Sequence, residues 1–281
     1  MNELLDGFVR CPRCTDSHAL VRRSDEGAFT CPHCQASYPV HEGVVDLKPE
    51  RRFKRSFAQS LMESPTIARI YDGTLWRRSG WQQKALGILL DDEVAIVMNA
   101  AQAESSATLL DVACGSGVYA RLFARAMPRG CVVGMDISMP MLTWAARKDQ
   151  QENTTNVAYL RADAHELPFD DASFERVNCC GALHLFPDLD AVLAEIHRVM
   201  KPGGRFTTGT FRKRMGVLGR MRTGTGHSMG VNCFTPEGVV ALLKRRGFDD
   251  VQVHHDRARW MILSATKGGD SGGCSFADGA H

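Results

Sequence analysis

A regular alternation of short apolar and amphipathic segments, from residue 107 onward, constrains the fold most. The apolar runs predict strands at 107–112, 131–136, 156–161, 174–180, 204–211, 248–254 and 259–266. Helical periodicity predicts helices between them at 117–127, 139–149, 188–200 and 235–247. Such alternation is typical of an α/β domain whose mostly parallel sheet carries helices on both faces. Only "DRAR" separates the last two strands, which is too short for a crossover, so the last strand is predicted to be antiparallel.

The composition changes along the 281-residue chain and divides it into four expected parts. Residues 1–50 are dense in cysteine, proline and turn formers, and 51–106 follow as a helical linker and cap. Residues 107–267 form the α/β domain, and the Gly/Ser-rich stretch 268–281 is predicted to be a disordered tail. A hydrophobic fraction of 44% is ample for a sizeable core.

The stretch "LLDVACGSGVYARLFAR" places a glycine-rich turn between a strand and a helix. It fits the dinucleotide pattern G-x-G-x-x-G/A, and Asp136 ends the next strand, where a carboxylate can bind ribose hydroxyls. NAD and S-adenosylmethionine (SAM) both fit so far. Asp111 favours SAM, because a carboxylate at the turn would repel a pyrophosphate and attract the SAM ammonium and sulfonium. The alternative is a tight strand–helix turn that binds no ligand.

Four motifs follow one another along the chain: "LLDVACGSGVYA", "VVGMDIS", "RADAHELPFDDASFERVNCCGALHLFPD" and "EIHRVMKPGGRF". In order and spacing they resemble the motifs of the class I SAM-dependent methyltransferases, and within that class those of the group that includes ubiquinone-type methyltransferases. The resemblance covers about residues 107–266. It implies a Rossmann-like, seven-stranded sheet with an antiparallel last strand, and methyl transfer from SAM.

The resemblance also implies a set of cofactor-binding residues. Those expected at the methionine end of SAM are Asp111, Ala113, Gly115 and Gly117. Those expected around the ribose and adenine are Asp136, Ile137, Met141, Asp163 and Ala164. Those expected beside the transferred methyl group are Cys179, Cys180 and Gly181. Asp136 would bind the ribose and Asp163 the adenine amino group, whereas Met141 suits core packing equally well.

Methyl transfer from SAM is an SN2 reaction on an activated sulfonium, so alignment and desolvation are much of the enzyme's task. A base is needed only where the acceptor must lose a proton. His184, just after the fourth predicted strand of the α/β domain, is the candidate catalytic residue. Its alternative is a structural histidine at a strand–helix junction.

Two C-x-x-C pairs lie near the amino end: "CPRC" with Cys11 and Cys14, and "CPHC" with Cys31 and Cys34. Two such turns can hold four sulfurs in a tetrahedron, which suits a structural zinc ion and predicts a zinc ribbon. The alternatives are two disulfides or a redox pair. His33 is not expected to be a ligand, because four cysteines already complete the site.

The next segment, "ASYPVHEGVVDLKPE", resembles the small zinc-ribbon proteins that partner methyltransferases. It also resembles the amino-terminal ribbon of some ribosomal RNA guanine methyltransferases. Residues 1–50 carry eight acidic and five basic side chains, so this ribbon is a poor phosphate binder. We expect it to brace the helical cap or to bind a protein partner.

Two further features bear on the substrate. Tyr71, Trp76 and Trp81 form either a wall for an aromatic substrate or ordinary helix packing. Segment 201–222 carries seven lysines and arginines and no acid, so it is either a grip for an anionic substrate or RNA, or a solvated loop. A SAM-dependent methyltransferase acting on a small molecule is the main hypothesis. RNA methylation is the second, and a non-catalytic SAM-binding, partner-docking protein is the third.

Charge and hydropathy bear on nucleic-acid binding, membrane insertion and export. The net charge of +2 does not indicate a whole-surface grip on nucleic acid. No apolar run reaches about 18 residues, so no transmembrane helix is expected. The start "MNELLDGFVR" lacks the apolar core of a secretory signal, which predicts a cytoplasmic protein with reduced or metal-bound cysteines.

Overall fold

A computed structural model describes residues 2–14, 20–23, 27–47, 83–84, 86–213 and 232–269. Tyr71, Trp76 and Trp81, most of the expected helical cap, and nearly all of the expected tail lie outside the described residues. Part of the basic segment, residues 214–222, lies outside them as well.

The seven strands expected after residue 107 all form. They are β5 (Thr108–Val112), β6 (Cys131–Asp136), β7 (Val157–Arg161), β8 (Phe174–Cys180), β9 (Met200–Phe211), β10 (Phe248–Arg257) and β11 (Trp260–Lys267). Their order in the sheet is β7-β6-β5-β8-β9-β11-β10. The first five run parallel, and β11 pairs antiparallel with both β9 and β10. The antiparallel last strand is therefore confirmed.

The sheet is larger than the sequence predicts, because the amino-terminal strands extend it beyond β7. These are β1 (Val21–Arg23), β2 (Ala28–Thr30), β3 (Ser37–His41) and β4 (Val44–Asp46). Strand β4 pairs parallel with β7, and β3, β2 and β1 follow in antiparallel order. The described sheet has eleven strands instead of the expected seven beside a separate ribbon. The physical reason is that β7 otherwise presents an open edge of unpaired backbone groups.

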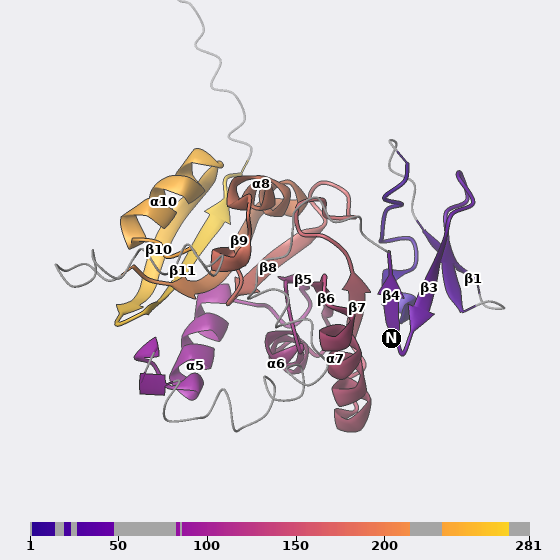
Figure 1. Cartoon of the computed structure of the whole chain (residues 1–281), viewed down its shortest axis with the longest axis horizontal. Helices are drawn as coiled ribbons and strands as arrows, with labels where there is room; N and C mark the ends of the chain where they lie inside the picture. The colour runs from indigo at the N-terminus through magenta and orange to yellow at the C-terminus, as the bar shows by residue number, and fades with distance from the viewer. Residues whose placement is uncertain are drawn as a thin grey trace, which may run out of the picture.

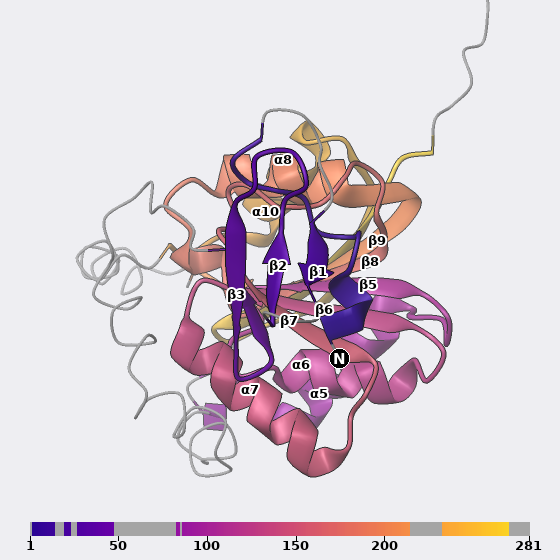
Figure 2. The same cartoon turned by 90° about the vertical axis from the view of Figure 1, so that its right-hand side faces the viewer.

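Helices cover both faces of the central strands. Helices α5 (Leu90–Ala101), α6 (Val118–Ala126) and α7 (Met139–Glu152) lie on one face, and α8 (Leu189–Val199) and α10 (Pro236–Arg245) lie on the other (Figure 1). Each face has its own buried cluster: Phe123 and Leu142 belong to one, and Leu193 and Leu243 to the other. The cluster on the α8 side extends into the amino-terminal segment. Figure 2 shows β1–β3 at the end of the sheet, separated from β7 by β4.

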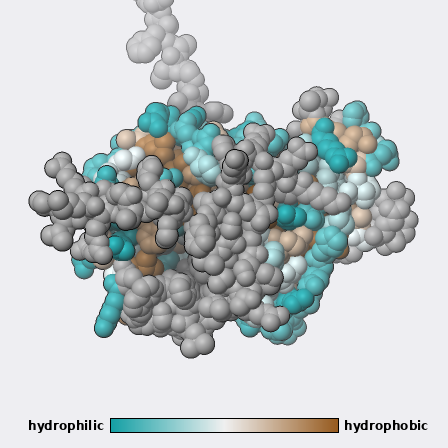
Figure 3. Space-filling model, in the orientation of Figure 1, coloured by the Kyte–Doolittle hydropathy of each residue, from teal (hydrophilic) through white to brown (hydrophobic). Residues whose placement is uncertain are grey.

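The described surface exposes few large hydrophobic side chains. Among the described residues, the large hydrophobic side chains that are exposed are Leu89 and Val253. On the face shown in Figure 3, hydrophilic residues form much of the rim. None of the helices in the described ranges is long and apolar enough to span a membrane.

The strand order reverses between β5 and β8, since β6 and β7 lie on one side of β5 and β8 lies on the other. In open α/β sheets, ligands bind beyond the carboxyl ends of the strands at such a switch point. The glycine turn follows β5 directly, and Asp136 and Cys180 end the two strands that flank it. The topology therefore gathers most of the predicted cofactor residues at one edge.

Candidate functional site

Asp111 lies near the carboxyl end of β5 and is only 2% exposed. Its neighbour across the sheet is Asn178 of β8, whose Nδ2 donates to Asp111 Oδ1 over 2.7 Å. Burial of a carboxylate is costly unless hydrogen bonds compensate, and Asn178 supplies one. Sequence analysis did not assign Asn178 a role, because pairing across the sheet fixes it. The pair holds the Asp111 carboxylate in one orientation at the mouth of the glycine turn.

The turn itself uses left-handed backbone conformations. Ala113, Gly115 and Gly117 have φ angles of 54°, 55° and 74°. At Gly117, a Cβ atom would lie 2.4 Å from the Tyr159 hydroxyl oxygen, so only glycine fits. At Gly115, no atom lies within 4 Å of where a Cβ would be. Gly117 thus allows α6 to pack on the sheet, whereas the space beside Gly115 is open for close approach to the backbone.

Asp136 links the glycine turn to the start of α7. Its Oδ2 accepts a hydrogen bond from the backbone N–H of Gly115, and its Oδ1 accepts one from that of Ser138, each over 2.8 Å. Ile137 follows, and its carbonyl accepts from Arg161 Nε over 3.1 Å. Met141 is 3% exposed, in keeping with core packing. The structure therefore brings together the glycine turn, the predicted ribose-binding carboxylate and Ile137.

Asp163 begins the loop that follows β7. Its Oδ1 accepts from the backbone N–H of His165 (3.0 Å) and lies 2.6 Å from His165 Nδ1. The His165 ring packs edge-on against Phe186, with centroids 6.0 Å apart. His165 was not predicted, although "DAH" in the sequence places it two residues after the aspartate. Asp163 and Ala164 lie in this fixed loop, and their adenine contacts stay a prediction.

A second buried carboxylate lies near the end of β8. Glu93 of α5 is 3% exposed, and its Oε1 accepts from the Tyr119 hydroxyl of α6 over 2.8 Å. Cys180 Sγ lies 3.7 Å from the same oxygen. Sequence analysis missed Glu93 and Tyr119. The sequence gives only a weak indication of Glu93: an acidic residue lies on the same buried face of α5 as Val97.

Cys179 and Gly181 flank Cys180. Burial, with the negative charges of Asp111 and Asp136, raises the pKa of the Cys179 thiol well above its usual value. That thiol therefore stays protonated and is a poor nucleophile. Gly181 has a φ of 89°, and its N–H donates to the carbonyl of Gly209.

His184 lies in a short 3-10 helix, η2 (Leu183–Leu185), and is 6% exposed. Its Nδ1 lies 3.4 Å from Thr210 Oγ1, and its ring packs edge-on against Phe211 with centroids 4.4 Å apart. Burial lowers the pKa of His184 to about 3, so the imidazole is neutral near pH 7. These surroundings match the structural alternative, and a role as general base stays a prediction.

The four cysteines of the amino-terminal segment come together. Their sulfurs all lie within 4.8 Å of one another, with Cys11–Cys34 and Cys14–Cys31 distances of 3.6 Å. A tetrahedral zinc ion bonded to sulfur at about 2.3 Å requires sulfurs about 3.8 Å apart, so this donor set fits zinc. The Cys34 backbone N–H also points to Cys31 Sγ, over 3.5 Å.

The four cysteines are free thiols in the structure, so neither proposed disulfide is present. At Cys31, burial raises the pKa, but hydrogen bonds from the Cys34 and His33 backbone and from neighbouring thiols lower it more, to about 7. A zinc ion bound among the four sulfurs would be held by them as thiolates. His33 Nδ1 lies 3.7 Å from Cys14 Sγ and is a neighbour of the sulfur set.

The described part of the basic segment is not an open phosphate grip. Arg205 is buried and donates to the Ala100 carbonyl and to Ser264 Oγ. Lys201 pairs with Glu175, and Arg212 pairs with Asp256. Three of the cations that suggested RNA binding therefore have partners within the fold.

Comparison with known proteins shows that the chain carries a methyltransferase domain. Residues 109–204 match the family model described as "Methyltransferase domain". Two uncharacterized chloroplastic methyltransferases of Arabidopsis thaliana are 29% and 30% identical over 222 and 224 residues, which is 72% and 73% of this chain. The chain spans 61% of the length of each. A demethylmenaquinone methyltransferase of Lactococcus lactis is 39% identical over 99 residues, 35% of this chain and 39% of that protein.

Solved structures share the fold at low sequence identity. Phosphoethanolamine N-methyltransferase 2 of Haemonchus contortus, in complex with SAM, superposes with a TM-score of 0.61 at 19% identity. The match covers 73% of this chain and 57% of that one. The [4+2]-cyclase SpnF superposes with a TM-score of 0.62 at 19% identity, over 75% of this chain and 96% of that one. The latter's name illustrates that fold alone does not define the reaction.

Proposed function

We propose that this chain, which carries a methyltransferase domain at residues 109–204, transfers a methyl group from SAM to a small-molecule acceptor. The observation that carries the proposal is the buried Asp111 carboxylate beside a glycine turn that is linked to Asp136. A carboxylate at this place suits the cationic methionine end of SAM and disfavours a pyrophosphate. The demethylmenaquinone methyltransferases among the relatives support a small, aromatic acceptor.

The chain's own residues would bind and orient the reactants. When bound, SAM would supply a methyl group on an activated sulfonium. An electron pair of the acceptor would form the new bond as the bond to sulfur breaks, S-adenosylhomocysteine would leave, and a protonated acceptor would lose its proton to a base or to water. Asp111, oriented by Asn178, would attract the positive charge of the donor, and Asp136 would accept from the ribose hydroxyls. Cys180 and Gly181 would lie at the methyl end, above the buried Cys179 thiol, which stays protonated and adds no charge. Holding donor and acceptor in line accounts for most of the rate gain in such a reaction.

The zinc ribbon belongs to the same proposal as a structural element. Cys11, Cys14, Cys31 and Cys34 would hold one zinc ion, which cross-links two turns of the amino-terminal segment. A cytoplasmic location stays a prediction supported by the free cysteines, although two relatives are described as chloroplastic. RNA and a protein partner of the ribbon remain alternatives.

A transfer assay with methyl-labelled SAM tests the proposal. The protein is added to lysate of a strain that lacks it, and label is counted in organic-extractable and RNA fractions. We expect label in the organic extract with the wild-type chain. D111N should lose it, and D92N, which changes an exposed residue of α5, should retain it.

Three other outcomes of these measurements would change the proposal. Label in RNA would replace the small-molecule acceptor by the RNA alternative. SAM binding without any transfer would favour the non-catalytic docking alternative. Absence of SAM binding to the purified wild-type protein would overturn the proposal.

A further inference from the structure

Two of the contacts between the amino-terminal segment and the methyltransferase domain involve segments that also carry residues expected around the adenosine half of SAM. One contact reaches the loop 163–171, which follows β7 and begins with Asp163. The other reaches Ile137, the residue after Asp136. We infer that Arg10 and Asp46 are positioning residues that set the affinity of the domain for adenosine. This inference rests on the proposed function, because it presumes that SAM is the ligand.

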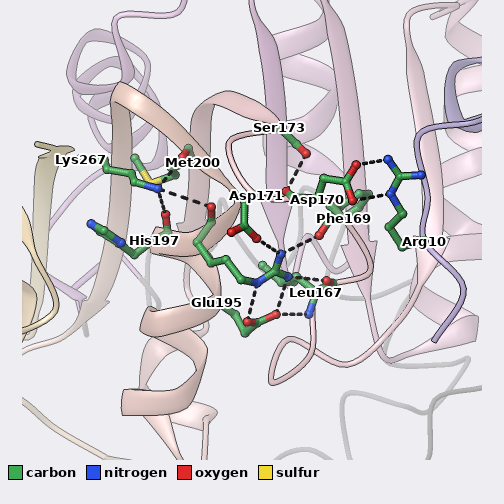
Figure 4. A network of polar contacts seen from close by, with 11 residues as sticks. Arg10, Leu167, Phe169, Asp170, Asp171, Ser173, Glu195, His197, Met200 and Lys267 are labelled. Carbon is green, nitrogen blue, oxygen red and sulfur yellow. Dashed lines mark hydrogen bonds and ion pairs between the residues drawn. The ribbon is translucent and has the colours of Figure 1, made fainter. Parts of the chain in front are cut away.

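Arg10 holds the far end of the loop. Its backbone N–H donates to the Pro168 carbonyl over 2.8 Å, and its guanidinium binds both carboxylate oxygens of Asp170. Phe8, two residues earlier, packs edge-on against Phe174 with centroids 5.2 Å apart and contacts Phe169 at 5.7 Å. A bidentate arginine–carboxylate pair fixes orientation as well as distance. Figure 4 shows Arg10 reaching Asp170 from the side opposite Glu195.

Helix α8 holds the same loop from the other side. Arg198 donates to the carbonyls of Leu167 and Phe169 over 2.8 Å each, and pairs with Asp171. Glu195 accepts from the Leu167 N–H over 2.8 Å (Figure 4). The loop is therefore clamped between α8 and the amino-terminal segment. Loss of the Arg10–Asp170 pair removes the side-chain hydrogen bonds that hold the loop from the amino-terminal side and leaves there only the Arg10 backbone hydrogen bond and the Phe8 contact.

Asp46 acts on the ribose side. It lies on β4, is 6% exposed, and pairs with Arg161 of β7 over 3.2 Å. The same Arg161 side chain donates from Nε to the Ile137 carbonyl. Asp46 thus orients the guanidinium that holds the backbone just after Asp136. Because the Arg161 head group is shared, loss of Asp46 frees it to leave Ile137.

The cysteine cluster keeps Arg10 in place. Arg10 directly precedes Cys11, whose sulfur lies 3.2 Å from the Tyr38 hydroxyl of β3. Val9 is fully buried, and its carbonyl accepts from the Leu20 N–H. The turn that carries Arg10 is therefore anchored both in the ribbon's core and in the metal-binding sulfur set. Preorganisation of this kind lowers the ordering cost of ligand binding.

Calorimetric titration of the zinc-loaded, full-length protein tests the inference. The ligands are S-adenosylhomocysteine and 5′-methylthioadenosine, which keeps the adenosine and the sulfur but lacks the amino acid part. We expect R10Q and D46N to lower the affinity for both ligands by the same factor, about two- to thirtyfold. R10K should lose less, because an ammonium keeps the charge. D170N should lower the affinity as much as R10Q does. The double variant R10Q/D170N should lower it no further than either single variant, as expected of two residues that form one contact.

E42Q is the matched control. Glu42 pairs with Arg147 of α7, so this change also removes an ion pair between the ribbon and the domain, but one at exposed residues away from loop 163–171. We expect wild-type affinity in E42Q. Hydrogen exchange of the amides in 163–171 should accelerate in R10Q and stay unchanged in E42Q, which a general loss of stability would not produce.

Two results separate the possible failures. If the wild type binds both ligands and folded, zinc-containing R10Q and D46N bind them equally well, the inference is wrong and the proposed function stands. If the wild type binds neither ligand, both fail. Should R10Q not fold, R10K and D170N decide by the same criterion.

Discussion

At the scale of single residues, Gly117 is the tightest point of the glycine turn. Its φ of 74° favours glycine, and a Cβ atom at this position would lie only 2.4 Å from the Tyr159 hydroxyl oxygen. A side chain here must push Tyr159 or α6 away from the sheet. The same residue serves stability and the cofactor turn, because α6 begins directly after it.

We predict that G117A destabilises the fold by about 2–4 kcal/mol, since it adds a steric clash to the cost of a left-handed non-glycine residue. Urea denaturation measures this change. G203A is the control, because Gly203 has the same φ of 74° and no atom within 4 Å of a Cβ. It should cost only about 1–2 kcal/mol. Equal losses in the two variants would contradict the role of the clash.

Asp149 of α7 is a fully buried acid beneath the glycine turn. Burial raises its pKa to about 6, and the Tyr159 hydroxyl and Arg121 offset only part of that effect. Because the folded pKa lies above the unfolded value, the folded state binds more protons between about pH 4 and 6. The stability contributed by the protonated acid is therefore lost as pH rises through this window.

D149N should remove that pH dependence. We predict that the variant is more stable than the wild type at pH 7, by about 1–3 kcal/mol, and not at pH 4. Thermal or urea unfolding at several pH values measures it, with D92N as an exposed control. A wild-type stability that rises from pH 4 to 6 relative to D149N would contradict the expectation.

At the scale of elements, we expect a metal bound to the four sulfurs to stabilise the amino-terminal strands. Strands β1, β2 and β4 are three residues each, and such short strands bury little apolar surface on their own. In structural zinc sites the metal supplies folding energy directly. The strands should therefore be more stable with the metal bound.

We predict that chelation of the metal, or C14S, lowers the first thermal unfolding transition and speeds hydrogen exchange in β2 and β3. Strands β5 and β6 should keep their protection. C233S is the control, because Cys233 is an exposed thiol outside the sulfur set. Metal analysis should give one zinc per chain in the wild type and C233S. A metal-free wild type with the same stability would exclude a structural metal.

At the scale of the whole molecule, the ribbon completes the sheet. Val44 and Val45 are fully buried, and β7 gains its outer partner from β4. The ribbon also covers Phe169 and Phe174 with Phe8. The amino-terminal segment is thus part of the domain's architecture in addition to any partner that it binds.

Deletion of residues 1–47 should therefore make the rest of the chain prone to self-association. It uncovers the edge of β7 and an aromatic surface, both of which favour association. We predict that the shortened chain self-associates, as measured by light scattering, where the full chain does not. A monomeric and stable shortened chain would show that the domain needs no ribbon.

The sequence by itself determined the seven central strands, their helices, the glycine turn and the grouping of the cysteines. These follow from local signals: periodicity, turn residues and the spacing of ligand pairs. The tertiary structure alone decided that β4 joins β7, that Asn178 orients Asp111, that Glu93 reaches Cys180, and that Arg205 is buried instead of solvated. The reason is that each of these contacts joins residues far apart in the chain, and no local pattern encodes which edge, register or facing side chain will meet.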